Sequence, residues 1–217
     1  MDHTWTSIAG HSCNRYEETR GKKADTSREQ MQRYKHYYDR FKIHGNSYGV
    51  EKQKLGPTLL ERVRLLEADL KRPLTIRDGD WLIRAHRRLL VSRQVLSRSY
   101  VFAYYMFDGE ETPTRPEPGS LPMARRQDLF EDYQEQVEGN VERLSKLLGT
   151  DDAAGLPEEE EILRVRQHTI NLTGTVEKLC RQMHSCIQDE LLPMLVEPMS
   201  IMSYQPGGPS KATELPP

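Results

Sequence analysis

The stretch DWLIRAHRRLLVSRQVLSRSYVFAYYMF, residues 80–107, decides the fold class. Its apolar side chains recur mostly at intervals of three and four residues, which places them on one face of an α-helix. Asp78, Gly79 and Asp80 precede this face and can cap the first turn. The apolar face consists of Leu82, Ala85, Leu89, Leu96, Tyr100, Ala103 and Phe107. Five arginines lie mostly outside this face, namely Arg84, Arg87, Arg88, Arg93 and Arg98. The pattern predicts a long amphipathic helix.

Two further long helices are predicted on the C-terminal side of this stretch. The first carries apolar residues at Phe130, Tyr133, Val137, Val141, Leu144 and Leu148, and Gly149 can end it. The second carries Ile162, Val165, Thr169, Leu172, Val176, Leu179, Met183 and Cys186, and its pattern can continue to Pro193. Its start is marked by Pro157, which has no amide hydrogen to lose in a first turn, and by four glutamates that meet the positive end of the helix dipole.

On the N-terminal side, a helix is predicted to begin at Thr26 and to place Met31, Tyr34, Tyr38 and Phe41 on one face. We expect residues 45–49, which include two glycines, to interrupt it, and Gly56-Pro57 to break it again. A further helix over 59–70 should stop before Pro73.

These patterns predict an all-α protein, an elongated bundle of about four to five helices, three of them long. An irregular arm over 1–25 precedes the helical region 26–203. Residues 108–122, rich in proline, and residues 150–156 read as loops. Residues 204–217, which hold Pro206-Gly207-Gly208-Pro209, read as a disordered tail.

Charge is divided unevenly along the chain, although the net charge is only −2. Residues 15–98 hold 21 Lys or Arg and 11 Asp or Glu, whereas residues 99–217 hold 10 and 21. Basic and acidic helices that pack on each other would explain this division, and a basic face for an acidic partner is the alternative. Nucleic-acid binding is not expected, because aromatic residues are sparse among the arginines of residues 80–107.

No complete catalytic, cofactor-binding or metal motif occurs in the sequence, whether a phosphate loop, a nucleophile elbow or a Cys-x-x-Cys pair. Cys180 and Cys186 are six residues apart, so on a helix they point well apart and read as thiols of a helix face. The cluster of Tyr34, His36, Tyr37 and Tyr38 is expected to serve helix packing, with an interaction hot spot as the alternative.

The chain has no stretch of about 18 apolar residues, so no membrane helix is expected. Its start lacks the basic and apolar regions of a secretory signal. Three cysteines suit a reducing compartment. We therefore expect the protein in the cytoplasm, the nucleus or both.

Several segments resemble one protein family in their order and spacing. His3-Thr4-Trp5 and Gly10-His11-Ser12-Cys13-Asn14-Arg15-Tyr16 are similar to the end of the second RING-like domain of Ariadne-type RBR ubiquitin ligases, in the form of the plant branch. Three later segments are similar to the helical Ariadne domain of that family, namely QRYKHYYDRF at 32–41, SYVFAYYMF at 99–107 and NVERLSKLL at 140–148. The resemblance covers roughly residues 1–200.

The resemblance implies a role in protein ubiquitination. Such ligases accept ubiquitin from an E2 onto a cysteine of the second RING-like domain and pass it to a substrate. Their Ariadne domain packs on that catalytic domain and holds it inactive, and in animal relatives a neddylated cullin-RING ligase relieves the block. The partners implied are thus the catalytic RING-like domain, in cis or in trans, together with an E2 and a cullin-RING ligase.

The resemblance also assigns particular residues. Cys13 is similar to the last zinc ligand of the second RING-like domain, and His3 best matches the ligand before it, with His11 as the alternative. Two zinc ligands and the catalytic cysteine would lie upstream of Met1, so the zinc site here is incomplete and this chain alone is expected to be inactive. We expect it to be a truncated product, a fragment or a partial gene model. The pair that contacts the catalytic domain in animal members aligns with Val50-Glu51.

Three functions are consistent with these observations. The first is a regulatory, autoinhibitory Ariadne domain that binds protein partners. The second is an active ubiquitin transferase, which this chain could be only as part of a longer polypeptide. The third is a helical scaffold or interaction module unrelated to ubiquitin.

Overall fold

The computed structural model describes residues 26–107, 122–149 and 158–194, and within these ranges all regular structure is helical. The elements are α1 (Thr26–Val50), the π-helical turn η1 (Glu51–Leu55), α2 (Gly56–Ala68), α3 (Leu74–Arg77), α4 (Asp80–Met106), α5 (Met123–Leu148), α6 (Glu159–Ser185), the π-helical turn η2 (Cys186–Leu191) and the short 3-10 turn η3 (Leu192–Met194). The prediction of an all-α fold with long helices is confirmed.

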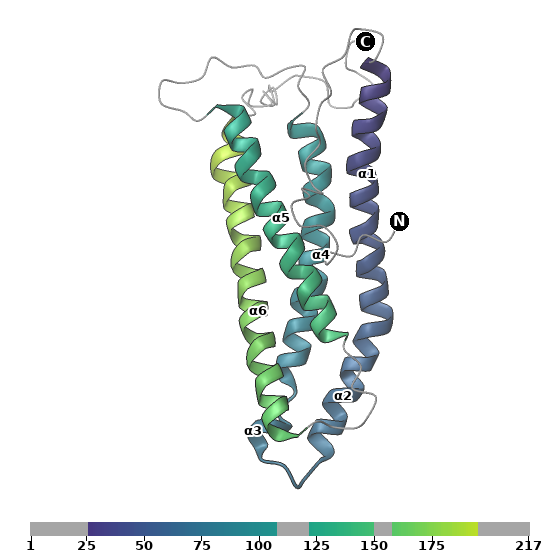
Figure 1. The fold of residues 1–217 in the computed structure, drawn as a ribbon, viewed down its shortest axis with the longest axis vertical. Coiled ribbons are helices and arrows are strands. Elements are labelled where there is room, and N and C mark those ends of the chain that lie inside the picture. Colours follow the sequence, from purple (N-terminus) through teal and green to yellow (C-terminus); the bar gives the residue numbers. More distant parts are fainter. Residues whose placement is uncertain (1–25, 108–121, 150–157, 195–217) are drawn as a thin grey trace, which may run out of the picture.

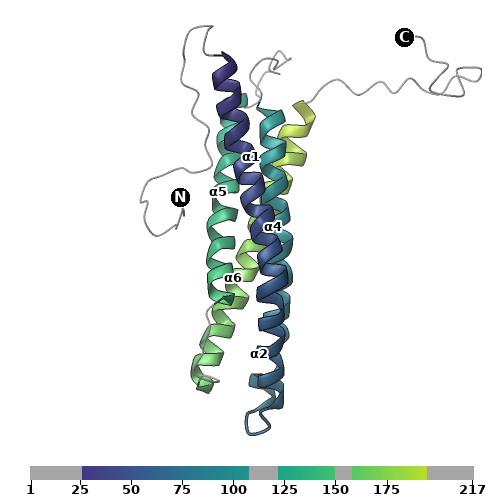
Figure 2. The ribbon, with the colours of Figure 1, turned by 90° about the vertical axis from the view of Figure 1, so that its right-hand side faces the viewer.

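The helices form an elongated four-helix bundle in which neighbours along the chain run in opposite directions (Figure 1). The continuous run α1–η1–α2 is one side of the bundle, and α4 returns along it. The helix α4 is central, since it packs against α1, α5 and α6, and α5 packs against α6. Figure 2 shows the same bundle from the side, with α1 and α4 crossing at a small angle.

The apolar stripes predicted for α4, α5 and α6 face the core. On α4 the side chains of Leu82, Ala85, Leu89, Leu96, Tyr100 and Ala103 are at most 2% exposed. Phe130, Val137, Val141 and Leu144 of α5 are fully buried, as are Val176 and Thr169 of α6. Because the apolar residues of each stripe recur with the helical repeat, each helix buries one face and exposes the other to solvent. Arg93, which the sequence placed off the apolar face of this helix, instead lies on the buried side of α4 with 2% exposure.

The predicted breaks at 45–49 and at Gly56-Pro57 are wrong. The helix α1 runs through both glycines to Val50, and η1 and α2 continue it to Ala68. A glycine inside a helix costs only about 1 kcal/mol, and contacts with α4 on either side offset that cost. Phe41 accepts a hydrogen bond from Ser97 through its carbonyl, at 2.9 Å. At the second position, the π turn ends two residues before Pro57, whose missing amide hydrogen removes one helical hydrogen bond.

The structure also revises the role of the aromatic residues of α1. Tyr37 is buried at 4% exposure, so packing explains it. Tyr34 and Tyr38 are 48% and 40% exposed, and Met31 and Phe41 on the same face are exposed as well. The side of α1 that meets α4 carries Arg33, Tyr37 and His44 instead. Hydrogen bonds and ring contacts, rather than an apolar stripe, therefore hold α1 in place.

Several predicted segments lie outside the described residues. They are the N-terminal arm, most of the loop after residue 107, the loop before residue 158 and the C-terminal tail. The last helix begins at Glu159, with Glu158 as its cap and acidic residues in its first turn, and helical structure continues to Met194. None of the helices that the structure describes is long and apolar enough to cross a membrane.

Candidate functional site

A buried ion pair joins the end of α1 to the middle of α4. Glu51 is the first residue of η1, and Arg93 lies on α4. Arg93 Nε lies 3.0 and 3.1 Å from the two carboxylate oxygens of Glu51, and Nη2 lies 2.8 Å from Oε1. The two side chains are 2% and 7% exposed. Because both charges are largely shielded from water, each depends on its protein partners for stabilisation.

Two residues of α5 complete the arrangement. Arg93 donates through Nη1 to the carboxylate of Glu142, and the Ser145 hydroxyl donates to Glu51 Oε1 at 2.7 Å. Burial acts to lower the pKa of Arg93, but the hydrogen bonds with Glu142 and Glu51 outweigh it and raise that pKa above its ordinary value. The guanidinium therefore stays charged. We call Glu51, Arg93, Glu142 and Ser145 the Arg93 cluster; it ties η1, α4 and α5 together.

His44 and Glu138 extend the Arg93 cluster. His44 Nδ1 lies 3.3 Å from Arg93 Nη1, and because a guanidinium can only donate, Nδ1 accepts. His44 Nε2 lies 3.5 Å from Glu138 Oε1, and the Tyr100 hydroxyl donates to Glu138 Oε2 at 2.6 Å. Burial acts to raise the pKa of Glu138, but the interactions with His44 and Tyr100 outweigh it and hold that pKa below its ordinary value. Three carboxylates, those of Glu51, Glu138 and Glu142, thus face their donors between α1, η1, α4 and α5.

The backbone of η1 is also held from α4. His86 Nε2 lies 3.0 Å from the carbonyl oxygen of Glu51, which also accepts the amide hydrogen of Gly56. A Cβ at Gly56 would come within 3.0 Å of His86 Cε1, so the absence of a side chain allows this close approach. Both the side chain and the main chain of Glu51 are therefore fixed.

The structure places the predicted contact pair Val50-Glu51 at this position but separates its two side chains. Val50 is 53% exposed, whereas Glu51 is 6% exposed and points into the Arg93 cluster. Neither placement tests the inhibitory contact, which stays a prediction. His3 and Cys13, the predicted partial zinc site, lie outside the described residues.

Sequence reasoning missed Arg93, Glu142, His44 and Glu138. One signal was available for Arg93, because it lies four residues after Leu89 and three before Leu96 and so shares their face. His44 and Glu138 gave no comparable signal, since their pairing depends on how α1 and α5 are placed around α4.

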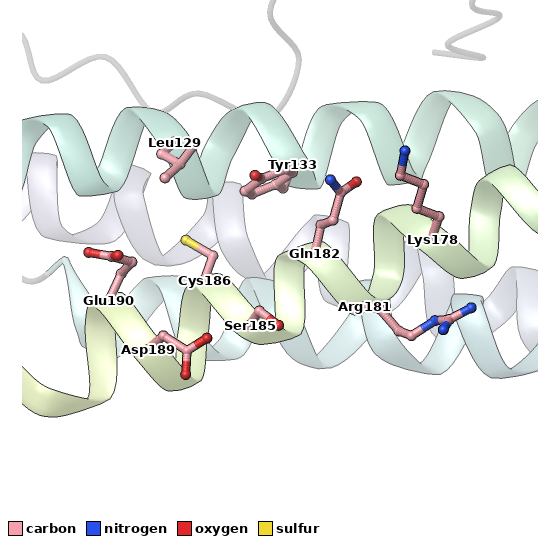
Figure 3. Close-up of a pocket in the computed structure, with 9 residues that line it drawn as sticks. All are labelled: Leu129, Tyr133, Lys178, Arg181, Gln182, Ser185, Cys186, Asp189 and Glu190. Carbon is pink, nitrogen blue, oxygen red and sulfur yellow. The ribbon is translucent and has the colours of Figure 1, made fainter.

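The described cysteines do not resemble nucleophiles. Cys180 and Cys186 are free and buried, and burial raises the pKa of each thiol. Cys186 lies at a hollow of about 530 Å³ between α5 and the end of α6, shown in Figure 3. Its other lining residues are Leu129, Tyr133, Lys178, Arg181, Gln182, Ser185, Asp189 and Glu190. A raised pKa leaves less thiolate, the form that attacks.

Potential metal ligands do not gather in the described part of the chain. Within residues 26–107, 122–149 and 158–194, no three His, Cys, Asp or Glu side chains are placed to hold a metal ion. The donor set of a zinc site is therefore not found in this helical part, and we derive no step through a metal from it.

Comparisons with known proteins identify the family. A family model described as the Ariadne domain matches residues 32–217. The probable E3 ubiquitin-protein ligase ARI3 of Arabidopsis thaliana is 38% identical over 98% of this chain and 39% of its own length. The probable E3 ubiquitin-protein ligase ARI1 of the same plant is 39% identical over 89% and 31%. The E3 ubiquitin-protein ligase ariadne-1 of Drosophila melanogaster is 26% identical over 78% and 30%.

This chain spans about a third to two-fifths of the length of these relatives. The family match covers most of the chain, and it includes every helix that carries the Arg93 cluster. The resemblance drawn from the three helical segments is thereby confirmed. The chain belongs to the Ariadne family of RBR E3 ubiquitin ligases.

Proposed function

We propose that this chain is the regulatory Ariadne domain of a ubiquitin ligase, which binds the catalytic RING-like domain and holds it inactive. Its role in ubiquitination would need an E2, and a cullin-RING ligase would be the partner that relieves the block. Zinc would belong to the RING-like domain, with His3 and Cys13 as ligands. The protein would act in the cytoplasm, the nucleus or both. The family match supports a place in ubiquitination, and the geometry around Val50 supports the regulatory role.

The observation that carries the proposal is the pairing of an exposed apolar side chain with a fixed backbone. Val50 presents its side chain at the surface, and the next residue is held by Arg93, Ser145 and His86. An apolar residue that does not move can fill a pocket on a partner with little loss of conformational entropy. We therefore assign the direct contact to Val50. Glu51 acts as a positioning residue, because its oxygens are already hydrogen-bonded inside the bundle.

The test is a chimaera in which this chain replaces the matching C-terminal segment of Arabidopsis ARI3. Tethering supplies the effective concentration that a weak contact needs. Discharge of ubiquitin from a loaded E2 should be slower in the chimaera than in the same ligase cut before its Ariadne domain. Val50→Asp should restore much of the rate, because a carboxylate cannot enter an apolar pocket without loss of its hydration.

Leu60→Asp is the matched control, since Leu60 lies on α2 and is 51% exposed. It should leave the chimaera as slow as the unsubstituted form. The alternative function, a helical scaffold unrelated to ubiquitin, requires equal rates for the chimaera, the cut ligase and both variants. Equal rates would therefore reject the regulatory role.

A further inference from the structure

Five aromatic rings form a continuous series across α1 and α4, well away from Val50. The ring centroids of Phe41 and Tyr38 are 6.4 Å apart, and those of Tyr38 and Tyr34 are 5.5 Å apart. The series crosses to α4 at Tyr34 and Tyr104, 6.1 Å apart, and ends at Tyr105, 5.1 Å further on. We call these residues the aromatic ladder. It joins two helices into one surface.

Arg33 anchors the aromatic ladder where it crosses between the helices. Its guanidinium carbon lies 4.5 Å from the ring centroid of Tyr104, and its Nη2 donates to the Tyr104 carbonyl. The side chain is 7% exposed. A cation held against a ring face in this way fixes the ring. Tyr104, which links the rings of α1 to those of α4, is therefore held in place.

Most of the aromatic ladder is exposed to water. Tyr105 is 73% exposed, Tyr34 48%, Tyr38 40% and Phe41 39%, and Met31 extends the surface along α1 at 65%. These exposed side chains contribute little to the core, which consists chiefly of the stripes of α4, α5 and α6. Contiguous exposed apolar surface marks interaction sites, and tyrosine is among the residues that carry most binding energy at interfaces.

The aromatic ladder is distinct from the contact proposed at Val50. Sixteen residues of helix separate Tyr34 from Val50, or about 24 Å at 1.5 Å per residue. Figure 1 shows the start of α1 beside the end of α4, at the opposite end of α1 from α2. A partner bound at one surface would leave the other accessible.

The spacing and the charge around the aromatic ladder define its occupant. Met31, Tyr34, Tyr38 and Phe41 follow one helical face over about 15 Å, or nearly three turns, which suits a partner helix laid alongside. Among the exposed side chains of residues 28–42, Arg28, Lys35 and Lys42 are basic and Asp39 is acidic. Lys35 and Lys42 are exposed, and Lys42 Nζ lies 5.7 Å from the Tyr38 ring centroid. We propose that the aromatic ladder docks an acidic amphipathic helix of a partner protein.

In this arrangement the apolar face of the partner helix packs on the rings, and its carboxylates face Lys35 and Lys42. A nucleic acid fits less well, because Tyr34 and Tyr38 are stacked on each other at an interplanar angle of 16°. Each of these rings therefore has one face covered by its neighbour, whereas binding of single strands needs free faces on which bases stack.

The test is a selection from a phage library of 20-residue helical peptides on the full chain, with an excess of the variant Tyr34→Ser/Tyr105→Ser as competitor. We expect enriched peptides to carry net negative charge and apolar residues at helical spacing. Synthetic copies should bind the wild-type chain at least about tenfold more tightly than Tyr34→Ser or Lys35→Glu/Lys42→Glu, a difference typical of an interface hot spot.

Leu60→Ser on α2 and Ile170→Ser on α6, at 51% and 45% exposure, should bind these peptides as the wild type does. Circular dichroism must show that all variants remain helical. Enriched peptides with net positive charge would overturn the proposal, as would peptides that bind Tyr34→Ser as tightly as the wild type. Displacement of the peptides by oligo(dT) would overturn it as well. Release of inhibition by Tyr34→Ser in the chimaera would also overturn it, because the surface would then belong to the catalytic contact.

Discussion

Glu51 and Arg93, 42 residues apart along the chain, form a buried side-on ion pair, with Arg93 Nη2 2.8 Å from Glu51 Oε1. The same guanidinium donates to Glu142 of α5. One arginine on the central helix therefore balances carboxylates from two neighbouring helices. Such clusters contribute little net stability compared with an apolar core, but removal of one member is costly because it leaves buried charge uncompensated.

Removal of the Arg93 guanidinium should destabilise the bundle strongly. In Arg93→Met, the carboxylates of Glu51 and Glu142 lose their shared cation, and the free energy of unfolding should fall by about 3–5 kcal/mol. Urea unfolding followed by circular dichroism measures this. Arg64→Met is the control, since Arg64 is 76% exposed and pairs with Glu61 at the surface; it should change the same quantity by less than about 0.5 kcal/mol. A loss below about 1 kcal/mol for Arg93→Met would show that water can replace the guanidinium.

Glu138 should make stability depend on acidity. Its pKa is lowered in the folded state, because the interactions with His44 and Tyr100 outweigh the effect of burial. A lowered pKa gives stability that is complete above the pKa of the unfolded chain, near 4.5, and that is lost as the pH falls through the folded value. The free energies of unfolding of the wild type and of Glu138→Gln should therefore converge as the pH is lowered from 7 to 3. A gap between them that widens with acid would contradict this sign.

The two described thiols should react slowly in the folded chain. Burial raises the pKa of both Cys180 and Cys186, and the nearby Glu190 adds to the effect at Cys186. At pH 8 less thiolate is present than in the unfolded chain, so iodoacetamide should modify both sites at least about tenfold more slowly without urea than with it. Peptide mass spectrometry separates the sites. We also expect no reducible ubiquitin adduct at either cysteine when the chain meets E1, a cysteine-reactive E2 and ubiquitin.

The sequence predicted the helices of the core because their apolar residues repeat with the helical period. Residues such as Leu89, Val137 and Val176 face inward wherever the helix lies, so their burial needs no knowledge of the neighbours. The position of α1 was harder to predict. It meets α4 through Arg33, Tyr37 and His44, whose types do not reveal a buried face, while its most apolar stripe faces water.

The candidate site was predictable only in part. The alignment with the family located Val50-Glu51, but no local pattern shows that Glu51 is buried and Val50 is not. Burial of Glu51 depends on Arg93 from 42 residues away and on Ser145 from 94 residues away. Pairings of that range are set by the packing of whole helices, and a single sequence carries no direct signal of them.

Zinc should not be needed for the helical part to fold. The core described for α4, α5 and α6 is continuous and apolar, and the described residues offer no cluster of metal ligands. Treatment with a strong chelator should therefore leave the helical signal in circular dichroism and its urea midpoint unchanged. A large loss of helicity would show that the N-terminal residues, with His3 and Cys13, support the bundle through a metal.

The continuity of the first long helix can be tested with two glycines. A Cβ at Gly49 would meet no atom within 4 Å, so Gly49→Ala should raise the free energy of unfolding by about 0.5–1 kcal/mol through helix propensity alone. A Cβ at Gly56 would lie 3.0 Å from His86 Cε1, and His86 would have to move away from the Glu51 carbonyl. Gly56→Ala should therefore be less stable than Gly49→Ala by about 1 kcal/mol or more.

Urea unfolding of the two variants and of the wild type measures this difference in the free energy of unfolding. The two variants can be compared directly, because each adds one methyl group to the same continuous helix. A gain at Gly49 is expected only if its backbone is helical, since alanine stabilises a helix and not the turn that the sequence suggested at residues 45–49. A loss at Gly49 would therefore contradict the continuous helix. Equal gains at both positions would instead show that His86 moves without cost and does not hold η1.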